Sequence, residues 1–180
     1  MADLSKRKRN RLTDYDYSKE GLYFVTVCSK DRKNIFATMK NNVGTGLAPV
    51  RIELTKIGQI IDKNWRDITN RYNNINIDEF IIMPNHIHGI VIINKRDGVL
   101  SRADARPAPT ISNILCSFKS KSSVEYLKYI KQNDLNISGK IWQRSFYDHI
   151  IRNERSLQEI REYVNNNPLN WDTDKNNINK

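Results

Sequence analysis

The feature that most constrains the fold is a pair of apolar segments on either side of a Pro-Asn dipeptide. Residues 75–83 (INIDEFIIM) and 86–94 (HIHGIVIIN) are rich in isoleucine, and β-branched residues favour extended strands. Pro84 and Asn85 suit the central positions of a tight turn. We therefore expect an antiparallel β-hairpin in the middle of the chain.

The rest of the chain alternates between strand-like and helix-like patterns. Residues 22–28 and 146–151 are rich in β-branched and aromatic side chains and are predicted strands, and residues 51–54 are a candidate short strand. The order β-α-β-β-α-β-α predicts an α+β protein with a mostly antiparallel sheet and helices packed on it. Apolar residues at helical spacing predict the helices over residues 55–72, 110–131 (with a candidate break at Ser122-Ser123) and 155–166.

Polar residues and a proline mark the ends of these helices. Thr55 is a candidate N-cap of the first helix. Ser156 and Glu159 have the spacing of a capping box at the start of the last helix, and Pro168 is expected to end that helix.

The composition excludes several classes of protein and indicates an anionic partner. The chain has 180 residues, enough for one domain, and 38% of them are hydrophobic, too many for a disordered chain. No apolar run approaches the ~20 residues of a membrane span, and the charged N-terminus lacks the apolar stretch of a secretory signal. Cys28 and Cys116 form no CxxC motif, so we expect reduced thiols in a cytoplasmic protein. The formal net charge of +10 favours a polyanionic partner, most commonly nucleic acid, and no membrane partner is expected.

Two of the three histidines lie two residues apart in the second strand of the hairpin. Residues at this spacing point to the same face of a strand, so the imidazoles of His86 and His88 are predicted to project side by side, about 7 Å apart at the backbone. Ile87, Val91 and Ile93 are expected to face the core on the other side. Such a pair can hold one divalent ion, or it can be two ordinary half-buried histidines.

The last predicted helix carries the candidates that would complete a metal site. Tyr163 and Asn167 are four residues apart and so share one helical face. The amide oxygen of Asn167 is a candidate third ligand, although the following Pro168 disfavours helical backbone there. Glu159, one turn before Tyr163, is the alternative oxygen ligand. Oxygen ligands suit Mg²⁺, whereas Zn²⁺ prefers a third nitrogen or sulfur.

Three motifs, in order along the chain, resemble a known family. MPNHIHGIV (83–91), WQRSFYDHIIRN (142–153) and EYVNNNP (162–168) resemble the single-tyrosine HUH transposases, in which HUH denotes His, a hydrophobic residue and His. Within that family the chain is most similar to the REP-associated tyrosine transposases. The resemblance covers residues 20–171.

The resemblance implies a fold, a site and a reaction. His86 and His88 match the family's metal ligands, Tyr163 its nucleophile and Asn167 its third ligand. The implied fold is the ferredoxin-like HUH endonuclease type, and the implied cofactor is Mg²⁺ or Mn²⁺. The implied activity is that of a transposase, which nicks and rejoins DNA at hairpin-flanked sites through a 5′-phosphotyrosine. The implied partner is single-stranded or hairpin DNA, bound by a monomer or a homodimer.

The expected domain organisation follows from the extent of the resemblance. We expect a flexible basic segment at 1–20, the HUH domain at 21–171 and a flexible tail at 172–180. Candidate DNA contacts are four basic residues outside the N-terminal segment, Lys119, Lys121, Arg144 and Arg152. The last two match recurrent family positions whose roles the sequence leaves open, as do Trp142, Gln143, His149 and Asn153.

Two other functions fit parts of the pattern. His86, His88 and His149 together are a candidate three-His Zn²⁺ site for a hydrolase. Alternatively, the chain is a non-catalytic, domesticated relative that binds hairpin DNA without cleaving it. Tightly held zinc would favour the first, and hairpin binding without cleavage in Mn²⁺ would favour the second.

Overall fold

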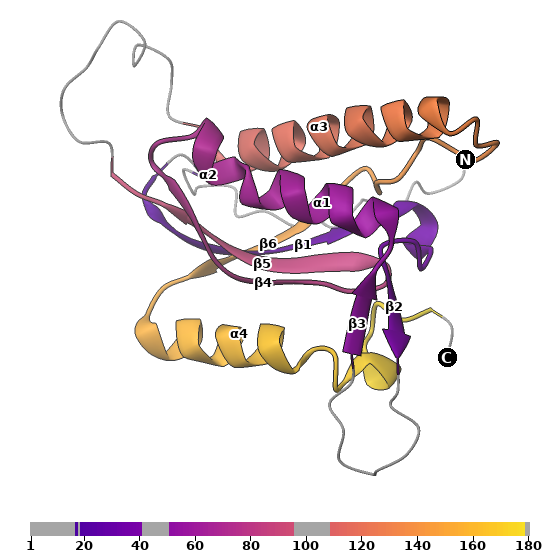
Figure 1. The fold of residues 1–180 in the computed structure, drawn as a ribbon. Coiled ribbons are helices and arrows are strands. Elements are labelled where there is room, and N and C mark those ends of the chain that lie inside the picture. Colours follow the sequence, from indigo (N-terminus) through magenta and orange to yellow (C-terminus); the bar gives the residue numbers. More distant parts are fainter. Residues whose placement is uncertain (1–16, 18, 41–50, 96–108, 179–180) are drawn as a thin grey trace, which may run out of the picture.

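The fold is an antiparallel sheet with helices on both faces. The computed structural model describes Tyr17 and residues 19–40, 51–95 and 109–178. Its main sheet has four strands, β1 (Gly21–Cys28), β4 (Ile75–Ile82), β5 (His86–Ile93) and β6 (Tyr147–Ile151). They lie in the order β4-β5-β1-β6, and every neighbouring pair is antiparallel (Figure 1). The predicted α+β class is therefore confirmed.

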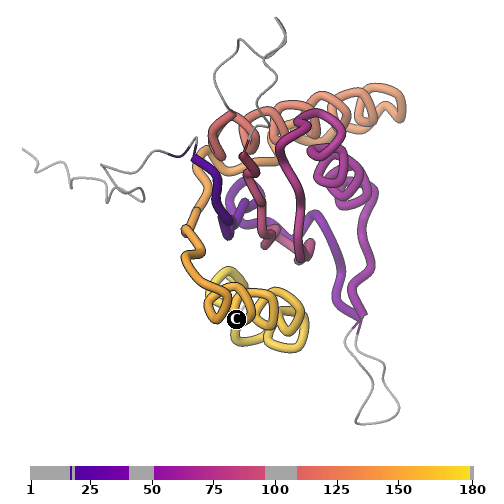
Figure 2. Tube along the Cα trace, turned by 90° about the vertical axis from the view of Figure 1, so that its left-hand side faces the viewer, coloured from indigo at the N-terminus to yellow at the C-terminus, as the bar shows by residue number. Residues whose placement is uncertain are grey.

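Helices cover both faces of this sheet, and a second, small sheet lies beside it. On one face lie α1 (Lys56–Arg66), α2 (Ile68–Arg71) and α3 (Ile111–Gln132), and α4 (Glu154–Asn166) lies on the other (Figure 1, Figure 2). The small sheet pairs β2 (Ala37–Lys40) with β3 (Arg51–Leu54). Two 3-10 turns, η1 (Lys30–Arg32) and η3 (Trp171–Thr173), follow β1 and α4.

A bilayer-crossing helix is not found: none of those in the described residues has both the length and the apolar character required.

The hairpin of β4 and β5 is present as predicted and fixes which side chains reach each face. Ile87, Val91 and Ile93 lie in the core between the sheet and the helices α1 and α3, as expected from alternation along β5. Gly89 allows this close packing, because a Cβ on Gly89 would come within 2.5 Å of the Trp65 ring. His86 and His88 alternate with these residues along β5 and therefore face the other side of the sheet, where α4 lies.

The first two predicted helices are present, but their interiors differ from the prediction. Thr55 caps α1 as predicted, and its side chain accepts a hydrogen bond from the Gly58 N–H. The helix nevertheless ends at Arg66, and α2 follows as a separate short turn. No break occurs at Ser122: α3 is continuous, and the Ser122 hydroxyl donates to the Phe118 carbonyl one turn earlier.

The last helix begins at Glu154, one residue before the predicted start, but the predicted capping box was wrong. α4 is capped by Asn153, whose side chain accepts a hydrogen bond from the Ser156 N–H at 2.8 Å. Ser156 therefore lies inside the helix and forms no capping box with Glu159. Asn accepts from the backbone as well as Ser does at this position, and it comes three residues earlier.

Of the two predicted terminal segments, the structure describes mainly the C-terminal one. The basic segment at 1–20 falls almost wholly outside the described residues. Residues 172–178 do not extend as a free tail, because Asp174 and Asn176 are buried and the Asn176 carbonyl accepts from the Asn85 side chain. The boundary at 21 stays a prediction.

Candidate active site

His86 and His88 lie side by side on β5, beneath α4. Both side chains are almost fully buried, and their ring centroids are 4.4 Å apart. The sequence predicted two imidazoles side by side on one face of the strand, and the structure places them so, buried more deeply than the half-buried pair of the alternative interpretation. β5 lies between β1 and β4, so the backbone that carries the pair is paired on both sides.

The orientation of His86 is determined by Asn85. The Asn85 side-chain Nδ2 donates to the carbonyls of Arg32 and Asn176, so its Oδ1 is left to accept from Nδ1 of His86 at 2.8 Å. His86 therefore carries its proton on Nδ1 and has a lone pair on Nε2. That buried Nε2 has no hydrogen-bond partner among the described residues.

His88 lies between a threonine and the tyrosine of α4. Its Nδ1 lies 2.9 Å from Thr26 Oγ1, and its Nε2 lies 3.2 Å from the hydroxyl of Tyr163. The rings of His88 and Tyr163 meet edge to face, with centroids 5.2 Å apart, and Phe24 packs against both. The structure thus brings the predicted nucleophile to the predicted histidine pair.

Tyr163 is the accessible member of the group. Its side chain is 41% exposed and lines a cavity of about 410 Å³, together with His88, Asn167 and Asp174. Partial burial raises the pKa of the Tyr163 phenol, and the negative charge of Asp174 raises that pKa further. The phenol is therefore neutral near pH 7 unless a positive charge is placed beside it.

Asn167 joins the site despite the proline that follows it. Its backbone keeps helical angles (φ −57°, ψ −38°), so the expected departure from the helix before Pro168 does not occur. The Asn167 side chain is buried, and its Nδ2 donates to Asp174 Oδ2 at 3.1 Å. Its Oδ1 is buried and, within the part of the chain described, has no hydrogen-bond partner.

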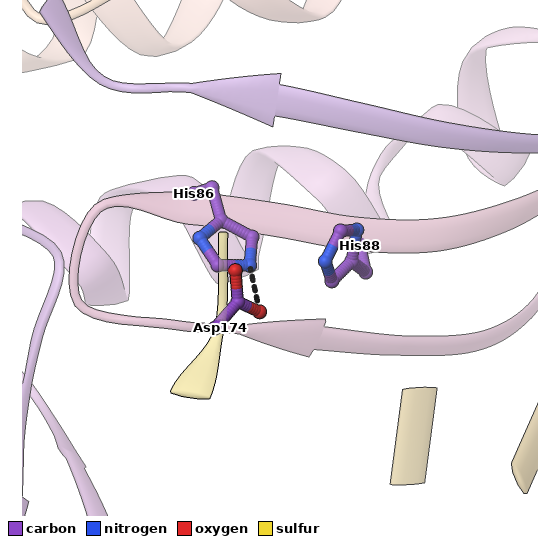
Figure 3. Close-up of side chains that lie close together, drawn as sticks. All are labelled: His86, His88 and Asp174. Carbon is purple, nitrogen blue, oxygen red and sulfur yellow. Dashed lines mark ion pairs between the residues drawn. The ribbon is translucent and has the colours of Figure 1, made fainter. Parts of the chain in front are cut away.

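Asp174 is the site residue that the sequence analysis missed. It follows η3, in the segment expected to be a tail, and its Oδ2 lies 4.0 Å from His86 Nε2 (Figure 3). One ligand atom each from His86, His88 and Asp174 lie within 4.8 Å of one another. No spacing rule links Asp174 to the histidines, and the nearest sequence signal is the aromatic Trp171, whose buried ring anchors the segment.

The donor set fits a divalent cation. Burial lowers the pKa of His86 to about 4, although the negative charge of Asp174 opposes this shift in part. Burial, and to a smaller extent the proximity of His86, lowers the pKa of His88 well below 6.5. Both imidazoles are therefore neutral near pH 7 and can offer lone pairs. The unpartnered Nε2 of His86 and Oδ1 of Asn167 are buried beside a carboxylate, and such groups are costly unless something pairs with them.

Two predicted alternatives are not brought to this site. Glu159 is exposed on α4 and pairs with Arg155, whose Nε lies 3.0 Å from its carboxylate. His149 is exposed on β6, opposite Phe24 in the register, and it is absent from the one group of three potential metal ligands in the described residues. The three-His zinc site is therefore wrong, because β1 separates His149 from β5.

The four candidate DNA contacts differ in their surroundings. The Lys119 ammonium donates to the backbone carbonyls of Gln143 and Arg144, so it supports the loop before β6. Lys121, Arg144 and Arg152 are exposed.

Comparison with known proteins identifies the family of the chain. The family model described as "Transposase IS200 like" matches residues 18–167. An uncharacterized protein of Haemophilus influenzae is 32% identical over 180 residues, covering 97% of this chain and 94% of that protein. A putative REP-associated tyrosine transposase of the same organism is 23% identical, covering 86% of this chain and 73% of that protein.

A solved structure has a similar fold. It is a REP-associated tyrosine transposase bound to a REP hairpin, with a TM-score of 0.53 and 19% identity, covering 89% of this chain and 74% of that one. The predicted resemblance to single-tyrosine transposases, and to the REP-associated type among them, is confirmed. Since the family model spans the sheet, both histidines, Tyr163 and Asn167, the chain belongs to the IS200-like transposase family.

Proposed function

We propose that this transposase cleaves and rejoins single-stranded DNA beside hairpins, with Tyr163 as the nucleophile and Mg²⁺ or Mn²⁺ as the cofactor. Family membership assigns a transposase-type, DNA-cleaving function. The observation that carries the residue assignment is the 3.2 Å separation between the Tyr163 hydroxyl and His88 Nε2, beside the buried histidine pair.

Four side chains would hold the cation. His86 and His88 offer Nε2, Asn167 offers Oδ1, and Asp174 offers a carboxylate oxygen. Asn85 and Thr26 bond the other ring nitrogens and so orient both imidazoles, as groups behind metal-binding histidines commonly do. When bound, the cation would favour the phenolate and offset negative charge on the phosphate.

Tyr163 would attack a phosphodiester from the cavity side of the site. Its Oη forms a bond to phosphorus, the bond from phosphorus to the 3′-oxygen breaks, and the 3′-oxygen takes up a proton. The phenolic proton leaves to solvent, which the exposed side chain permits. The product is a 5′-phosphotyrosine with a free 3′-hydroxyl, and attack by a 3′-hydroxyl reverses the step and rejoins the strand.

The partner that we propose is hairpin DNA with an unpaired flank. The solved relative is described as bound to a REP hairpin, and this chain has a net charge of +10. Lys121, Arg144 and Arg152 are exposed and available to phosphates, whereas Lys119 would act by supporting the loop that carries Arg144.

We propose a monomer that acts in cis. The Tyr163 hydroxyl reaches His88 of its own chain, so the described residues complete the site without a second copy. A mixture of Tyr163→Phe and His88→Ala chains should therefore form no covalent adduct, because neither chain has a complete site.

The experiment that tests the nucleophile is covalent trapping. A labelled library of hairpin oligonucleotides with randomised single-stranded flanks is incubated with the protein and Mn²⁺, and denaturing gels detect the adduct. We expect Tyr163→Phe to abolish the adduct completely. Tyr147→Phe is the matched control, because Tyr147 lines the same cavity and is also exposed. Persistence of the adduct in Tyr163→Phe would exclude this nucleophile, and hairpin binding by the parent chain without adduct would indicate a non-catalytic relative.

A further inference from the structure

A narrow apolar seam attaches α4 to the sheet. Leu157, Ile160 and Val164 recur at helical spacing and pack on the face of the sheet that α4 covers (Figure 1). Apolar contacts have no preferred direction, so three side chains in a row only weakly determine how far the helix is rotated about its own axis. Tyr163 belongs to the same helix but lies outside the seam, so its position depends on that rotation.

Arg161 and Tyr163 flank this seam on opposite sides. An α-helix turns by about 100° per residue, so residues two apart lie about 160° from each other around the helix. Arg161 reaches Asp78 on the edge strand β4. Tyr163 reaches His88 on β5 and packs against Phe24 on β1. A rotation of α4 about its axis therefore moves both contacts together.

The contact on the β4 side is directional. Arg161 donates to one carboxylate oxygen of Asp78 from Nε at 3.2 Å and to the other from a terminal nitrogen at 2.6 Å. Such two-point pairing fixes orientation as well as distance. The carboxylate is held in turn, because its Oδ1 accepts from the Glu79 N–H at 2.7 Å. The Asp78 side chain is only 13% exposed, so solvent and salt screen this pair less than a pair on the surface.

The backbone of β4 is irregular at the residue that receives Arg161. The register of β4 against β5 shifts between Ile77 and Phe80. Both of these side chains pack against the core on the far face of the sheet although they are three positions apart, so the two residues between them lie in a bulge. β-Bulges redirect side chains and are common next to active sites. Here the bulge presents Asp78 to α4, where its carboxylate meets the guanidinium of Arg161.

We propose that Arg161 and Asp78 are positioning residues, which fix the rotation of α4 so that the Tyr163 hydroxyl meets His88 Nε2. A rotation of about 10° moves an atom at the side-chain radius of a helix, about 5–6 Å, by about 1 Å. A misplacement of that size can slow a reaction about a hundredfold. The inference rests on the proposed function, since it takes Tyr163 to be the nucleophile. It adds a determinant of the cleavage rate that lies on the edge strand rather than among the metal ligands.

The first test separates the rate of cleavage from the binding of DNA. The probe is a hairpin oligonucleotide selected from the labelled library by adduct formation with the parent protein in Mn²⁺. Asp78→Asn and Arg161→Gln break the charged two-point contact, and each should lower the single-turnover rate of adduct formation at least about tenfold, whereas the Kd for the same oligonucleotide should change little. Arg155→Gln is the matched control, because Arg155 forms an exposed ion pair within α4 and should leave the rate unchanged.

The double variant tests whether the two residues act as a unit. Asp78→Asn combined with Arg161→Gln should be no slower than either single variant, because all three lack the same contact. Losses that multiply in the double variant, or rates equal to the parent in both single variants, would overturn the inference.

A second measurement reports the position of Tyr163 without any catalysis. The metal-free protein is labelled with 3-fluorotyrosine, and the ¹⁹F NMR signal of Tyr163 is identified by its loss in Tyr163→Phe. We expect Asp78→Asn and Arg161→Gln to shift this signal and to leave the other tyrosine signals in place, whereas Arg155→Gln should shift none.

The outcomes distinguish this inference from the proposed function. An unshifted Tyr163 signal beside normal adduct formation by the parent would reject the positioning role alone. A shift confined to Tyr163 in a protein whose parent form makes no adduct would reject the phosphotyrosine chemistry alone. Equal shifts of all the tyrosine signals would assign the pair a general structural role and overturn the inference.

Discussion

The two faces of the main sheet are made from the same strands, yet they differ in content. The face under α1 and α3 is a core of large apolar side chains, including Trp65, Leu115 and Phe118. The face under α4 has a smaller apolar cluster around Phe24 and Val164. The polar site lies beside this cluster, at the start of β5, whose first residue is His86. The comparison shows that alternate residues of one strand can form the stabilising core on one face of the sheet and the candidate active site on the other face.

The helices on the two faces are also attached differently. α1 and α3 pack through apolar rings, as when Trp65 meets Phe118 at 5.1 Å. α4 combines its small cluster with an ion pair to the edge strand, in which Arg161 donates to both carboxylate oxygens of Asp78, at 3.2 and 2.6 Å. Asp78 lies where the register of β4 shifts between Ile77 and Phe80.

The largest expected effect of a single substitution on folding is therefore on the α1 side. Trp65→Ala should lower the free energy of unfolding by about 3–5 kcal/mol, because it removes a fully buried ring from the centre of the core. Leu157→Ala, its counterpart under α4, should cost less, since its cluster is smaller. Urea unfolding followed by circular dichroism measures both. An equal or greater loss for Leu157→Ala would break the comparison.

The contrast also explains what the sequence could and could not predict. Alternation along β5 fixes the placement of Ile87 and His86 on opposite faces, and a spacing of four places Tyr163 and Asn167 on one side of α4, so local periodicity was enough. Asp174 was missed, because its position depends on how the segment after α4 packs against the sheet, where Trp171 is buried and the Asn176 carbonyl accepts from the Asn85 side chain.

The same reason accounts for the false alternatives. His149 and Glu159 have residue types that suit metal binding, but strand order and helix rotation decide which side chains meet. β1 lies between β5 and β6, and Glu159 is turned toward Arg155. The strand order does not follow from local sequence patterns, whereas the pairing of Glu159 with Arg155 four residues earlier is a local feature of the helix.

The next largest expected effect is on metal affinity. It tests whether the face of the sheet under α4 contains a metal-binding site. Asp174→Asn should weaken Mn²⁺ binding at least about tenfold, because it replaces a carboxylate with a neutral amide while keeping the size of the side chain. Isothermal titration calorimetry of the protein without DNA measures the affinity directly, and thermal melting without metal measures the separate cost of removing a buried acceptor from Asn167.

Asp172→Asn is the matched control, since Asp172 is an exposed residue of η3 in the same segment. Equal Mn²⁺ affinities for the two variants would remove Asp174 from the ligand set. Such a result would leave Asn167 as the sole oxygen ligand of the proposed set.

The smallest expected effect is on the melting temperature. It tests whether an ion pair contributes to holding α4 against the sheet, in addition to apolar packing. Hydrogen bonding from Arg161 lowers the pKa of Asp78 below its ordinary value of 3.8. A carboxyl group with a lowered pKa in the folded state stabilises the protein above that ordinary value, and the contribution is lost as the pH falls through the lower, folded-state pKa. Asp78→Asn should therefore lower the melting temperature by only a few degrees near pH 7, and the difference from the parent should vanish once the pH falls below the folded-state pKa of Asp78. Thermal melting across a pH series measures this, with Glu79→Gln on the same strand as the control, because Glu79 is exposed. A difference that persists undiminished into strong acid would mean that Asp78 holds α4 through its neutral contacts, and the two faces would then be attached more alike than the structure indicates.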